Sequence, residues 1–259
     1  MTHLITLGIV LGIYLHVWFL ISVFKKNLGL IDIAWGLSFV VIIWTVFLYT
    51  QSMSIASIAS LVLVTLWGLR LTYYLFLRNW SKPEDYRYDN MRKKWGKYPY
   101  LHAYIKVFYL QILLAFIISL PLQSVFYVKE GSSWFHVVIL GLGIALFIVG
   151  FIFESVSDAQ LKTFKSDSKN KGKIMDKGLW AYTRHPNYFG DFVIWISYFV
   201  IMFYSLDVNY AYAIIGSLIM GYLLRYVSGV PLLEKRYRDH ELYQAYAKKT
   251  PIFFPKLKK

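Results

Sequence analysis

Residues 4–24 of the chain read LITLGIVLGIYLHVWFLISVF and contain no Asp, Glu, Lys or Arg. A helix needs about 20 such residues to cross the hydrocarbon core of a bilayer, so this stretch predicts a membrane-spanning helix. No basic segment precedes it and no small-residue cleavage site follows it. We therefore expect it to remain as a helix instead of being removed as a signal peptide.

Six further apolar blocks follow, at residues 31–50, 55–77, 107–128, 134–153, 192–206 and 208–224. The last two are short, but they flank a tight polar turn at Asp207 and are interpreted as a helical hairpin. The composition agrees, because 58% of the residues are hydrophobic and only 16% are charged, against about a quarter charged in soluble domains. The sequence predicts an all-α polytopic membrane protein with about seven transmembrane helices.

The basic residues gather in alternate loops. Residues 78–106 hold eight Lys or Arg and residues 162–184 hold seven, whereas the opposite loops hold only Lys129. The positive-inside rule then places the N-terminus outside and the C-terminus in the cytoplasm. Basic cytoplasmic loops and their attraction to anionic lipid account for the net charge of +14, so membrane lipids are expected partners and nucleic acid is not. The chain has no cysteine, which excludes disulfides and cysteine-ligated metals; no metal site is expected.

Polar residues interrupt the apolar pattern in two places. The Pro-Glu-Asp sequence at residues 83–85 is typical of a helix start, because proline suits the first turn and acids favour the positive end of the helix dipole. In the second half, Glu154, Asp158 and Leu161 have the i, i+4, i+7 spacing of one helical face. A Lys-rich stretch at residues 166–176 then predicts a flexible basic loop.

The run RHPNY at residues 184–188 combines several signals. His185 precedes a proline, which disfavours the α conformation, and Asn187 is placed to cap the helix that follows. A helix start attracts anions, and Arg184 adds a fork-shaped phosphate ligand. Asp191 lies one turn after Asn187 on the same face. An ordinary Asn-capped membrane helix with a snorkelling Arg is the alternative, and both interpretations stay open at this point.

Further ionisable residues lie at and beyond the end of the last block. Arg225 stands where a Lys or Arg often merely snorkels. A helix from about 232 to 248 would place Glu234, Arg238 and Glu241 on one side. Because ionisable residues at the membrane edge are functional candidates by default, these residues and the RHPNY run predict one site at the cytoplasmic mouth of the bundle.

Three segments resemble a known family: GLWAYTRHPNYFGD at residues 178–191, Glu-x-x-x-Asp-x-Gln-Leu at 154–161 and SGVPLLE at 228–234. They resemble the steroid 5α-reductase C-terminal domain, most of all its bacterial branch of poorly characterised membrane proteins. The resemblance is strong over residues 151–255 and weaker in the first half. The same run is similar to C14 sterol reductases and, more loosely, to isoprenylcysteine carboxyl methyltransferases. All of these families imply a cytoplasm-facing pocket for a cofactor, which is NADPH in the reductases and S-adenosylmethionine in the methyltransferases.

The resemblance implies one membrane domain with substrate-side helices in residues 1–130 and a cofactor half in residues 131–259. The residues assigned to the cofactor are Glu154, Asp158, Lys165, Lys173, Tyr182, Arg184, His185, Asn187, Tyr188, Asp191, Arg225 and Glu234. Four of them fall at NADPH contacts of the 5α-reductases, namely Asp158, Asn187, Asp191 and Arg225. Lys165 and Lys173 stand where that family prefers Arg, which keeps the charge but not the bidentate geometry. Glu154 replaces an Asn, and Leu233 occupies the position of a Tyr.

The catalytic positions depart further from the family. In the 5α-reductases a Gln-Glu pair and a Tyr hold the steroid ketone; Asp32 aligns with that Glu and Arg70 with a family Arg, but Ile31 and Trp67 stand at the Gln and the Tyr. The candidates for the acid that polarises a carbonyl are Asp32, Tyr73, Tyr74 and Tyr88, and the residues assigned to catalysis are Asp32, Arg70 and Tyr88. A buried Asp can keep a raised pKa and donate a hydrogen bond. The alternative for Asp32 is a helix N-cap or an ion pair with Arg70.

The resemblance implies an NADPH-dependent reductase of a C=C bond in a lipophilic, steroid- or isoprenoid-like enone, with substrate entering from the bilayer. The expected location is the inner membrane of a bacterium, with the active site facing the cytoplasm. Two alternatives stay open. One is an S-adenosylmethionine-dependent membrane methyltransferase, and the other is a non-catalytic membrane protein that binds lipid or nucleotide.

Overall fold

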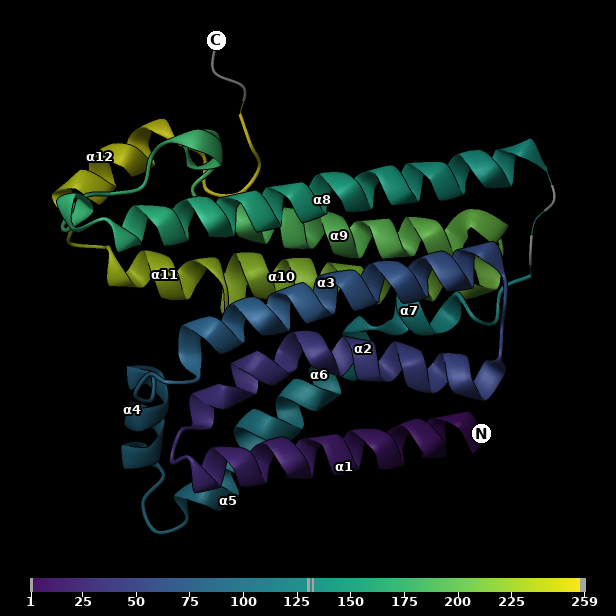
Figure 1. The fold of residues 1–259 in the computed structure, drawn as a ribbon, viewed down its shortest axis with the longest axis horizontal. Helices are drawn as coiled ribbons and strands as arrows, with labels where there is room; N and C mark the ends of the chain where they lie inside the picture. Colours follow the sequence, from purple (N-terminus) through teal and green to yellow (C-terminus); the bar gives the residue numbers. More distant parts are fainter. Residues whose placement is uncertain (1, 130, 132, 257–259) are drawn as a thin grey trace. The chain divides into compact units, whose positions relative to one another are not determined.

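Seven helical segments are long and apolar enough to cross a bilayer in the part of the chain that the structure describes. They are Thr2–Phe24, Leu28–Thr50, Ile55–Asn79, Pro99–Ile118, Trp134–Ser166, Pro186–Ser205 and Val208–Lys235. No strand occurs among the described residues. The prediction of an all-α protein with about seven transmembrane helices is therefore confirmed (Figure 1).

The structure is a computed structural model of the 259-residue chain, and it describes residues 2–129, 131 and 133–256. The chain divides into an N-terminal unit, residues 1–130, and a C-terminal unit, residues 131–259. That the two halves form one membrane domain stays a prediction.

The N-terminal unit is built on α1 (Thr2–Phe24), α2 (Ile31–Thr50) and α3 (Ile55–Asn79). The second and third of these helices approach closely because each has a glycine where they cross. A Cβ on Gly36 would lie 2.8 Å from the carbonyl oxygen of Gly68. Small residues of this kind let membrane helices pack backbone against backbone. This crossing fixes the position of α2, whose first turn carries the catalytic candidate Asp32.

Most of the polar segment after α3 is helical. α4 (Tyr86–Lys94) begins where the Asp85 carboxylate accepts a hydrogen bond from a backbone N–H of the first turn, so the helix start predicted from the Pro-Glu-Asp sequence is confirmed. α5 (Pro99–Ala103) leads into the π-helical η2 (Tyr104–Tyr109), which continues as α6 (Leu110–Ile118). The last three elements form the fourth apolar segment.

The predicted position of this fourth span, residues 107–128, is wrong. The apolar helical segment covers Pro99–Ile118, and the short α7 (Leu120–Ser124) follows it. Pro121 lacks a backbone N–H and cannot continue a preceding helix. The residues of α7 are largely buried in the unit, and the amide of Gln123 donates to a backbone carbonyl of α6 at 2.9 Å. Their apolar character therefore reflects packing against protein, which hydropathy does not distinguish from contact with lipid.

In the C-terminal unit α8 (Trp134–Ser166) and α9 (Pro186–Met202) run side by side (Figure 1). Glycines again set the distance between them, since a Cβ on Gly190 would lie 2.5 Å from the carbonyl oxygen of Gly150. α8 continues past residue 153, where the predicted span ended, and carries the polar face predicted after it. The first helix of this unit is thus both a membrane span and part of the candidate site.

A polar turn at Asp207 joins η5 (Phe203–Ser205) to η6 (Val208–Ala213). The carboxylate of Asp207 accepts a hydrogen bond at 3.0 Å from the backbone N–H two residues later, which stabilises the turn of the predicted hairpin. α10 (Ile214–Tyr222) and the π-helical η7 (Leu223–Val227) complete the returning segment. The hairpin interpretation is therefore confirmed.

Two short helices end the unit, α11 (Val230–Arg236) and α12 (Glu241–Lys249). The prediction of one helix over residues 232–248 is wrong, because the chain turns between them. The Tyr243 hydroxyl on the second helix donates to the Glu234 carboxylate on the first at 2.9 Å. Residues nine positions apart lie about 13 Å apart along a continuous helix, so this contact requires the turn. Tertiary hydrogen bonding overrides the local helical pattern here.

Candidate functional site

The carboxylate of Glu234 accepts three hydrogen bonds. Arg184 donates through Nη1 at 3.1 Å, His185 through Nε2 at 3.0 Å in the tautomer that carries its proton there, and Tyr243 through its hydroxyl at 2.9 Å. The side chains of Arg184, His185 and Glu234 are only 12%, 3% and 24% exposed. Charge-assisted bonds of this kind are among the strongest polar contacts in proteins. They fix the residues before α9 onto α11 and α12.

The start of α9 differs from the prediction. His185 is the N-cap residue, with φ −136° and ψ 62°, outside the α region as expected before proline, and Pro186 takes the first helical position, which suits proline. Asn187 lies inside the first turn and caps nothing, so the predicted Asn cap is wrong. Its side-chain amide instead donates to the Asp158 carboxylate at 3.4 Å, which joins α9 to α8.

Three carboxyl groups assigned to the cofactor are buried in α8 and α9. Glu154, Asp158 and Asp191 are 4%, 5% and 8% exposed. The glycine crossing lies beside them, since a Cβ on Gly190 would lie 2.6 Å from the backbone nitrogen of Glu154. Ionisable groups buried in membrane helices are costly and mark functional positions by default.

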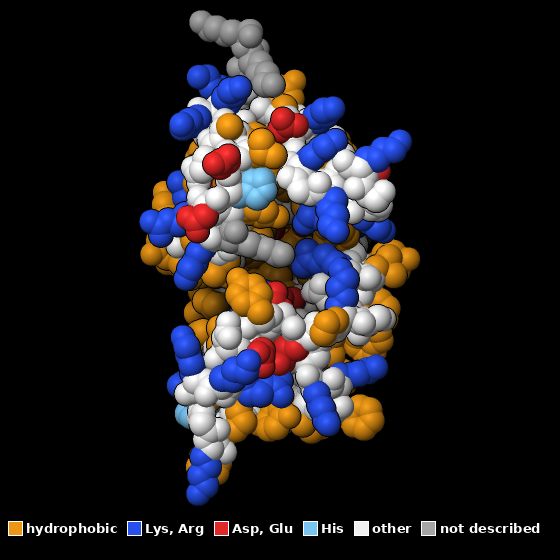
Figure 2. All heavy atoms as spheres, turned by 90° about the vertical axis from the view of Figure 1, so that its left-hand side faces the viewer, with side chains coloured by type: hydrophobic (Ala, Val, Ile, Leu, Met, Phe, Trp, Pro, Cys, Tyr) orange, Lys and Arg blue, Asp and Glu red, His pale blue; other side chains and the backbone are white. Residues whose placement is uncertain are grey.

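A cavity of about 600 Å³ opens between the end of α8, the loop after it and the α11–α12 turn. Four basic side chains line it, from Lys165, Lys171, Lys173 and Arg184, and Asp167 is the one carboxylate among its described lining residues. Figure 2 views the end of the C-terminal unit that carries α11 and α12, and it shows many Lys and Arg side chains there. The charge of this cavity suits an anionic ligand.

One wall of the cavity is aromatic. Trp180, Tyr237, Tyr243 and Tyr246 contribute to it, and the rings of Tyr237 and Tyr243 stack with centroids 5.1 Å apart and planes inclined by 23°. Burial raises the pKa of Tyr243 and of Tyr246 above the usual value, so both phenols stay neutral hydrogen-bond donors. Flat rings beside cationic side chains suit a ligand that carries both an aromatic base and phosphate.

The predicted basic loop is folded back on α8. η3 (Ser168–Asn170) forms its first turn, and Gly172, at φ +80°, and Gly178, at φ +60°, adopt left-handed conformations that glycine permits without strain. η4 (Gly178–Ala181) begins at the second glycine. There the Gln160 side chain of α8 accepts a hydrogen bond at 3.1 Å from the backbone N–H of Leu179, which anchors the end of the loop to α8.

A strap at residues 251–256 holds the segment before α9. Residues 182–184 form two backbone hydrogen bonds with it, at 2.9 and 3.0 Å. The buried hydroxyl of Thr183 adds a third, donating to the carbonyl oxygen of Phe253 at 2.8 Å. This strap is a functional segment that was not predicted, although its aromatic run bounded by Pro251 and Pro255 is a signal of an ordered, non-helical segment.

In the N-terminal unit the Asp32 carboxylate binds two residues of α4. The Tyr88 hydroxyl donates to Oδ1 at 3.1 Å, and Arg87 Nη2 lies 3.5 Å from Oδ2. Leu30 is the N-cap residue of α2, so the alternative in which Asp32 caps that helix is wrong. Burial, followed by the charge of Asp32, raises the pKa of Tyr88 well above its usual value, and the phenol stays protonated.

Comparison with known proteins adds a family. The family model described as "Protein of unknown function (DUF1295)" matches residues 18–250. The chain belongs to the DUF1295 family. This family is related to steroid 5α-reductase-like membrane proteins.

Two curated proteins match this DUF1295 chain. The uncharacterized protein C594.04c of Schizosaccharomyces pombe is 26% identical over 99% of the chain and 81% of its own length. The probable O-methyltransferase ustE of Ustilaginoidea virens is 39% identical over 69 residues, which is 27% of the chain and 24% of that protein. No solved structure gives a significant match.

The remaining cofactor candidates of this DUF1295 protein occupy varied surroundings. The ring of Tyr188 stacks on that of His185, with centroids 5.7 Å apart, whereas Tyr182 is 37% exposed. Arg225 lies in the π-helical η7, with its guanidinium 4.7 Å from the centroid of the Tyr226 ring. Their roles at a cofactor stay predictions.

The roles of the other catalytic candidates, and the alternative in which Asp32 pairs with Arg70, stay predictions. Arg70 lies in α3, Tyr73 is 65% exposed, and Tyr74 packs against the guanidinium of Arg78. Ile31 and Trp67 are fully buried. Both therefore pack in the interior at the positions where the resemblance implies a Gln and a Tyr.

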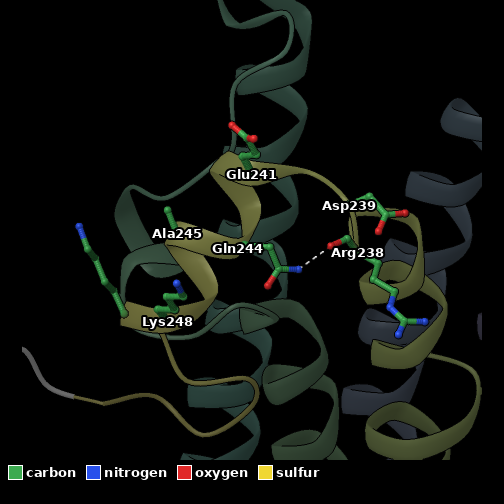
Figure 3. Close-up of a pocket in the computed structure, with 7 residues that line it drawn as sticks. Arg238, Asp239, Glu241, Gln244, Ala245 and Lys248 are labelled. Carbon is green, nitrogen blue, oxygen red and sulfur yellow. Dashed lines mark hydrogen bonds between the residues drawn. The ribbon is translucent and has the colours of Figure 1, made fainter.

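A second, more open hollow lies at the turn between α11 and α12 (Figure 3). Its lining mixes charges of both signs, from Arg238, Asp239, Glu241 and Lys248. The Gln244 amide donates to the backbone carbonyl of Arg238 at 2.7 Å and ties the turn to α12. The mixed charge and the open shape make it a weaker ligand site than the basic cavity.

His185 makes the stability of this unit depend on pH. Burial lowers its pKa below the value of about 6.5 for a free histidine, against the opposing effect of Glu234. The unfolded chain therefore takes up the proton more readily, and stability falls as pH drops through about 6.5 and below. Arg184 and Arg225 act in the same direction as burial.

We expect the melting temperature to fall between pH 7.5 and 5.5 by a few degrees more in the wild type than in His185→Gln, which cannot bind that proton. Thermal unfolding in detergent at several pH values measures this difference. Identical pH dependence in the two proteins would contradict the expectation.

Proposed function

We propose that this protein is a membrane-embedded, NADPH-dependent reductase of a C=C bond in a lipophilic enone. The observation that carries the proposal is the charge of the cavity. Lys165, Lys171, Lys173 and Arg184 line it with Asp167 as the one carboxylate described there. NADPH brings a diphosphate and a 2′-phosphate, for which Lys and Arg are the usual ligands. S-adenosylmethionine carries a sulfonium and no phosphate, so this charge favours it less.

The fit of a dinucleotide is supported by shape as well as by charge. The cavity volume of about 600 Å³ lies within the range of small-molecule sites. Trp180 and the stacked Tyr237–Tyr243 pair line the cavity with aromatic side chains, which suit an aromatic base. The hydrogen bonds to Glu234 fix Arg184 and His185 at the cavity wall, so these side chains would bind without first being ordered.

In the proposed reaction the cofactor supplies a hydride when it is bound, and the chain binds, orients and polarises. Asp32 and Tyr88 are the proposed polarising pair. The Tyr88 phenol stays protonated and donates its one proton to Asp32 in this structure. In the proposed reaction this O–H turns from Asp32 to the oxygen of an enone carbonyl and stabilises the negative charge that develops there when the β-carbon takes the hydride. The α-carbon of the resulting enolate then takes its proton from water. We propose that the substrate is lipophilic and enters from the bilayer.

We propose that the Asp32–Tyr88 pair of the N-terminal unit faces the cytoplasm of a bacterium, with the N-terminus outside. Within the N-terminal unit, the basic loops after α1 and α3 meet, since the Asn27 amide donates to the Lys82 carbonyl at 3.1 Å. At the other end Ser57 donates to the Val125 carbonyl at 3.2 Å, among loops almost free of Lys and Arg. The positive-inside rule supports the orientation.

Calorimetry with the purified protein in detergent tests the proposal. We expect NADPH to bind, NADH to bind more weakly and S-adenosylmethionine to bind weakest, with NADPH affinity falling as salt is raised because the contacts are ionic. A panel of enones, including cholest-4-en-3-one, should then cause NADPH oxidation. The proposal fails if NADPH does not bind, or if it binds and none of the enones is reduced.

A methyltransferase is the second candidate, favoured by the 39% identity to the probable O-methyltransferase ustE over 69 residues. The same calorimetry separates the two. Tighter binding of S-adenosylmethionine than of NADPH, followed by transfer of a labelled methyl group to a lipid extract, would support this candidate.

A further inference from the structure

Glu84 links α4 to the corner between α1 and α2. Its Oε1 accepts a hydrogen bond from the backbone N–H of Leu28 at 2.7 Å. One guanidinium nitrogen of Arg92, two turns along α4, contacts both carboxylate oxygens, at 2.6 and 2.7 Å. The Glu84 and Arg92 side chains are only 13% and 24% exposed, so solvent screens this pair less than an ordinary surface ion pair.

α4 depends on such contacts for its position. It has nine residues, most of them polar, and an isolated helix shorter than about 12 residues is marginal in water. Besides the Glu84–Arg92 pair, the amide of Asn27 donates to the Lys82 carbonyl just before the helix. The ring of Tyr88 lies against Gly29, where a Cβ would approach ring carbons to 3.3 Å.

This placement decides which side chains reach Asp32. With α4 held at the corner, the Tyr88 hydroxyl lies 3.1 Å from one oxygen of Asp32, and Arg87 Nη2 lies 3.5 Å from the other. The opposite face of α4 carries an ordinary surface pair, Asp89–Lys93, whose side chains are 49% and 71% exposed. One short helix is thus anchored by a partly buried ion pair and also carries an exposed pair that does not anchor it.

We propose that Glu84 and Arg92 are positioning residues that hold Tyr88 and Arg87 against Asp32. They act through α4 and do not touch the substrate. The consequence for catalysis rests on the proposed reductase function, in which Asp32 and Tyr88 polarise the substrate carbonyl. The positioning itself is a property of the fold and can be measured without turnover.

Accessibility of Tyr88 to tetranitromethane, read by peptide mass spectrometry, tests the positioning. Tyr88 is 5% exposed, so we expect little nitration in the wild type and a rise of about fivefold or more in Glu84→Gln and in Arg92→Gln. Arg92→Lys keeps a cation and should restore most of the protection. Lys93→Gln, which breaks the exposed pair on the same helix, is the matched control and should match the wild type.

Steady-state kinetics with cholest-4-en-3-one test the catalytic consequence. We expect kcat to fall about tenfold or more in Glu84→Gln and Arg92→Gln, while the NADPH dissociation constant changes less than twofold, and Arg92→Lys to recover most of the loss. The positioning role is overturned if Tyr88 nitration is equal in all variants. Nitration that rises while kcat is unchanged keeps the positioning and overturns the proposed role of Asp32 and Tyr88 in the reaction. A wild type that reduces no enone, with nitration raised only in the Glu84 and Arg92→Gln variants, overturns the reductase function and keeps the positioning.

Discussion

Replacing Gly190 by valine is expected to destabilise the C-terminal unit by about 3 kcal/mol, because inserting a side chain into a close-packed contact forces the backbone apart. A Cβ at Gly190 would lie 2.5 Å from the carbonyl oxygen of Gly150 and 2.6 Å from the backbone nitrogen of Glu154. Both neighbours are backbone atoms of α8 and cannot rotate away. α8 and α9 must therefore separate. The buried carboxyl groups of Glu154, Asp158 and Asp191 would then be displaced from their positions beside the crossing.

Gly141→Ala is the control for this effect. Gly141 lies in α8, the helix against which Gly190 packs, but a Cβ there meets nothing within 4 Å, so we expect a change within about 0.5 kcal/mol. Thermal unfolding of the purified variants, together with NADPH binding, measures both. If both substitutions lowered the free energy of unfolding equally, the loss would not come from the close approach of α8 and α9, and the role of the crossing would be contradicted.

Glu234→Gln is expected to raise the NADPH dissociation constant roughly tenfold, which corresponds to about 1.4 kcal/mol. The amide keeps the shape of the side chain but removes the charge that Arg184 and His185 meet at 3.1 and 3.0 Å. A buried guanidinium left without its counter-charge is unfavourable. Arg184 would then turn away from the geometry in which it lines the cavity.

Glu241→Gln is the matched control for this substitution. The substitution removes the same charge from the neighbouring helix. Glu241 is exposed at the start of α12 and lines the open hollow (Figure 3), and it is not among the residues that line the basic cavity. We expect its NADPH affinity to stay within about twofold of the wild type, since exposed charges contribute little. Calorimetry on the three proteins decides the matter, and a similar loss of affinity in both variants would mean that net charge, and not the Glu234 contacts, controls binding.

Hydropathy alone was enough to predict the membrane fold, because a helix that crosses a bilayer must be apolar over its whole length. It failed at residues 119–128, where apolar residues pack inside the N-terminal unit after the spanning helix has ended at Ile118. It also could not foresee the turn between α11 and α12. The hydrogen bond from Tyr243 to Glu234 joins residues whose order in the chain gives no sign of their contact.

The candidate site was predictable in its residue types more than in its contacts. The sequence pointed to Arg184, His185 and Glu234, which the structure brings together. Capping rules misassigned Asn187, because Pro186 takes the first helical position and leaves Asn187 one residue inside. Contacts between distant segments, such as Glu84 with Leu28, have no local signature in a single sequence.

The strap at residues 251–256 has a consequence for how the protein is made. α8 and α9 can pair as soon as both are synthesised, since they are consecutive spans and meet at their own glycines. The segment between them is different: Thr183 finds its partner only at Phe253, 70 residues further along the chain. During synthesis, which proceeds from the N-terminus, the bundle can therefore be in the membrane while the rim of the basic cavity is still unsupported. We therefore expect the protein to bind its ligand only after residues 251–256 have been synthesised and have paired with residues 182–184.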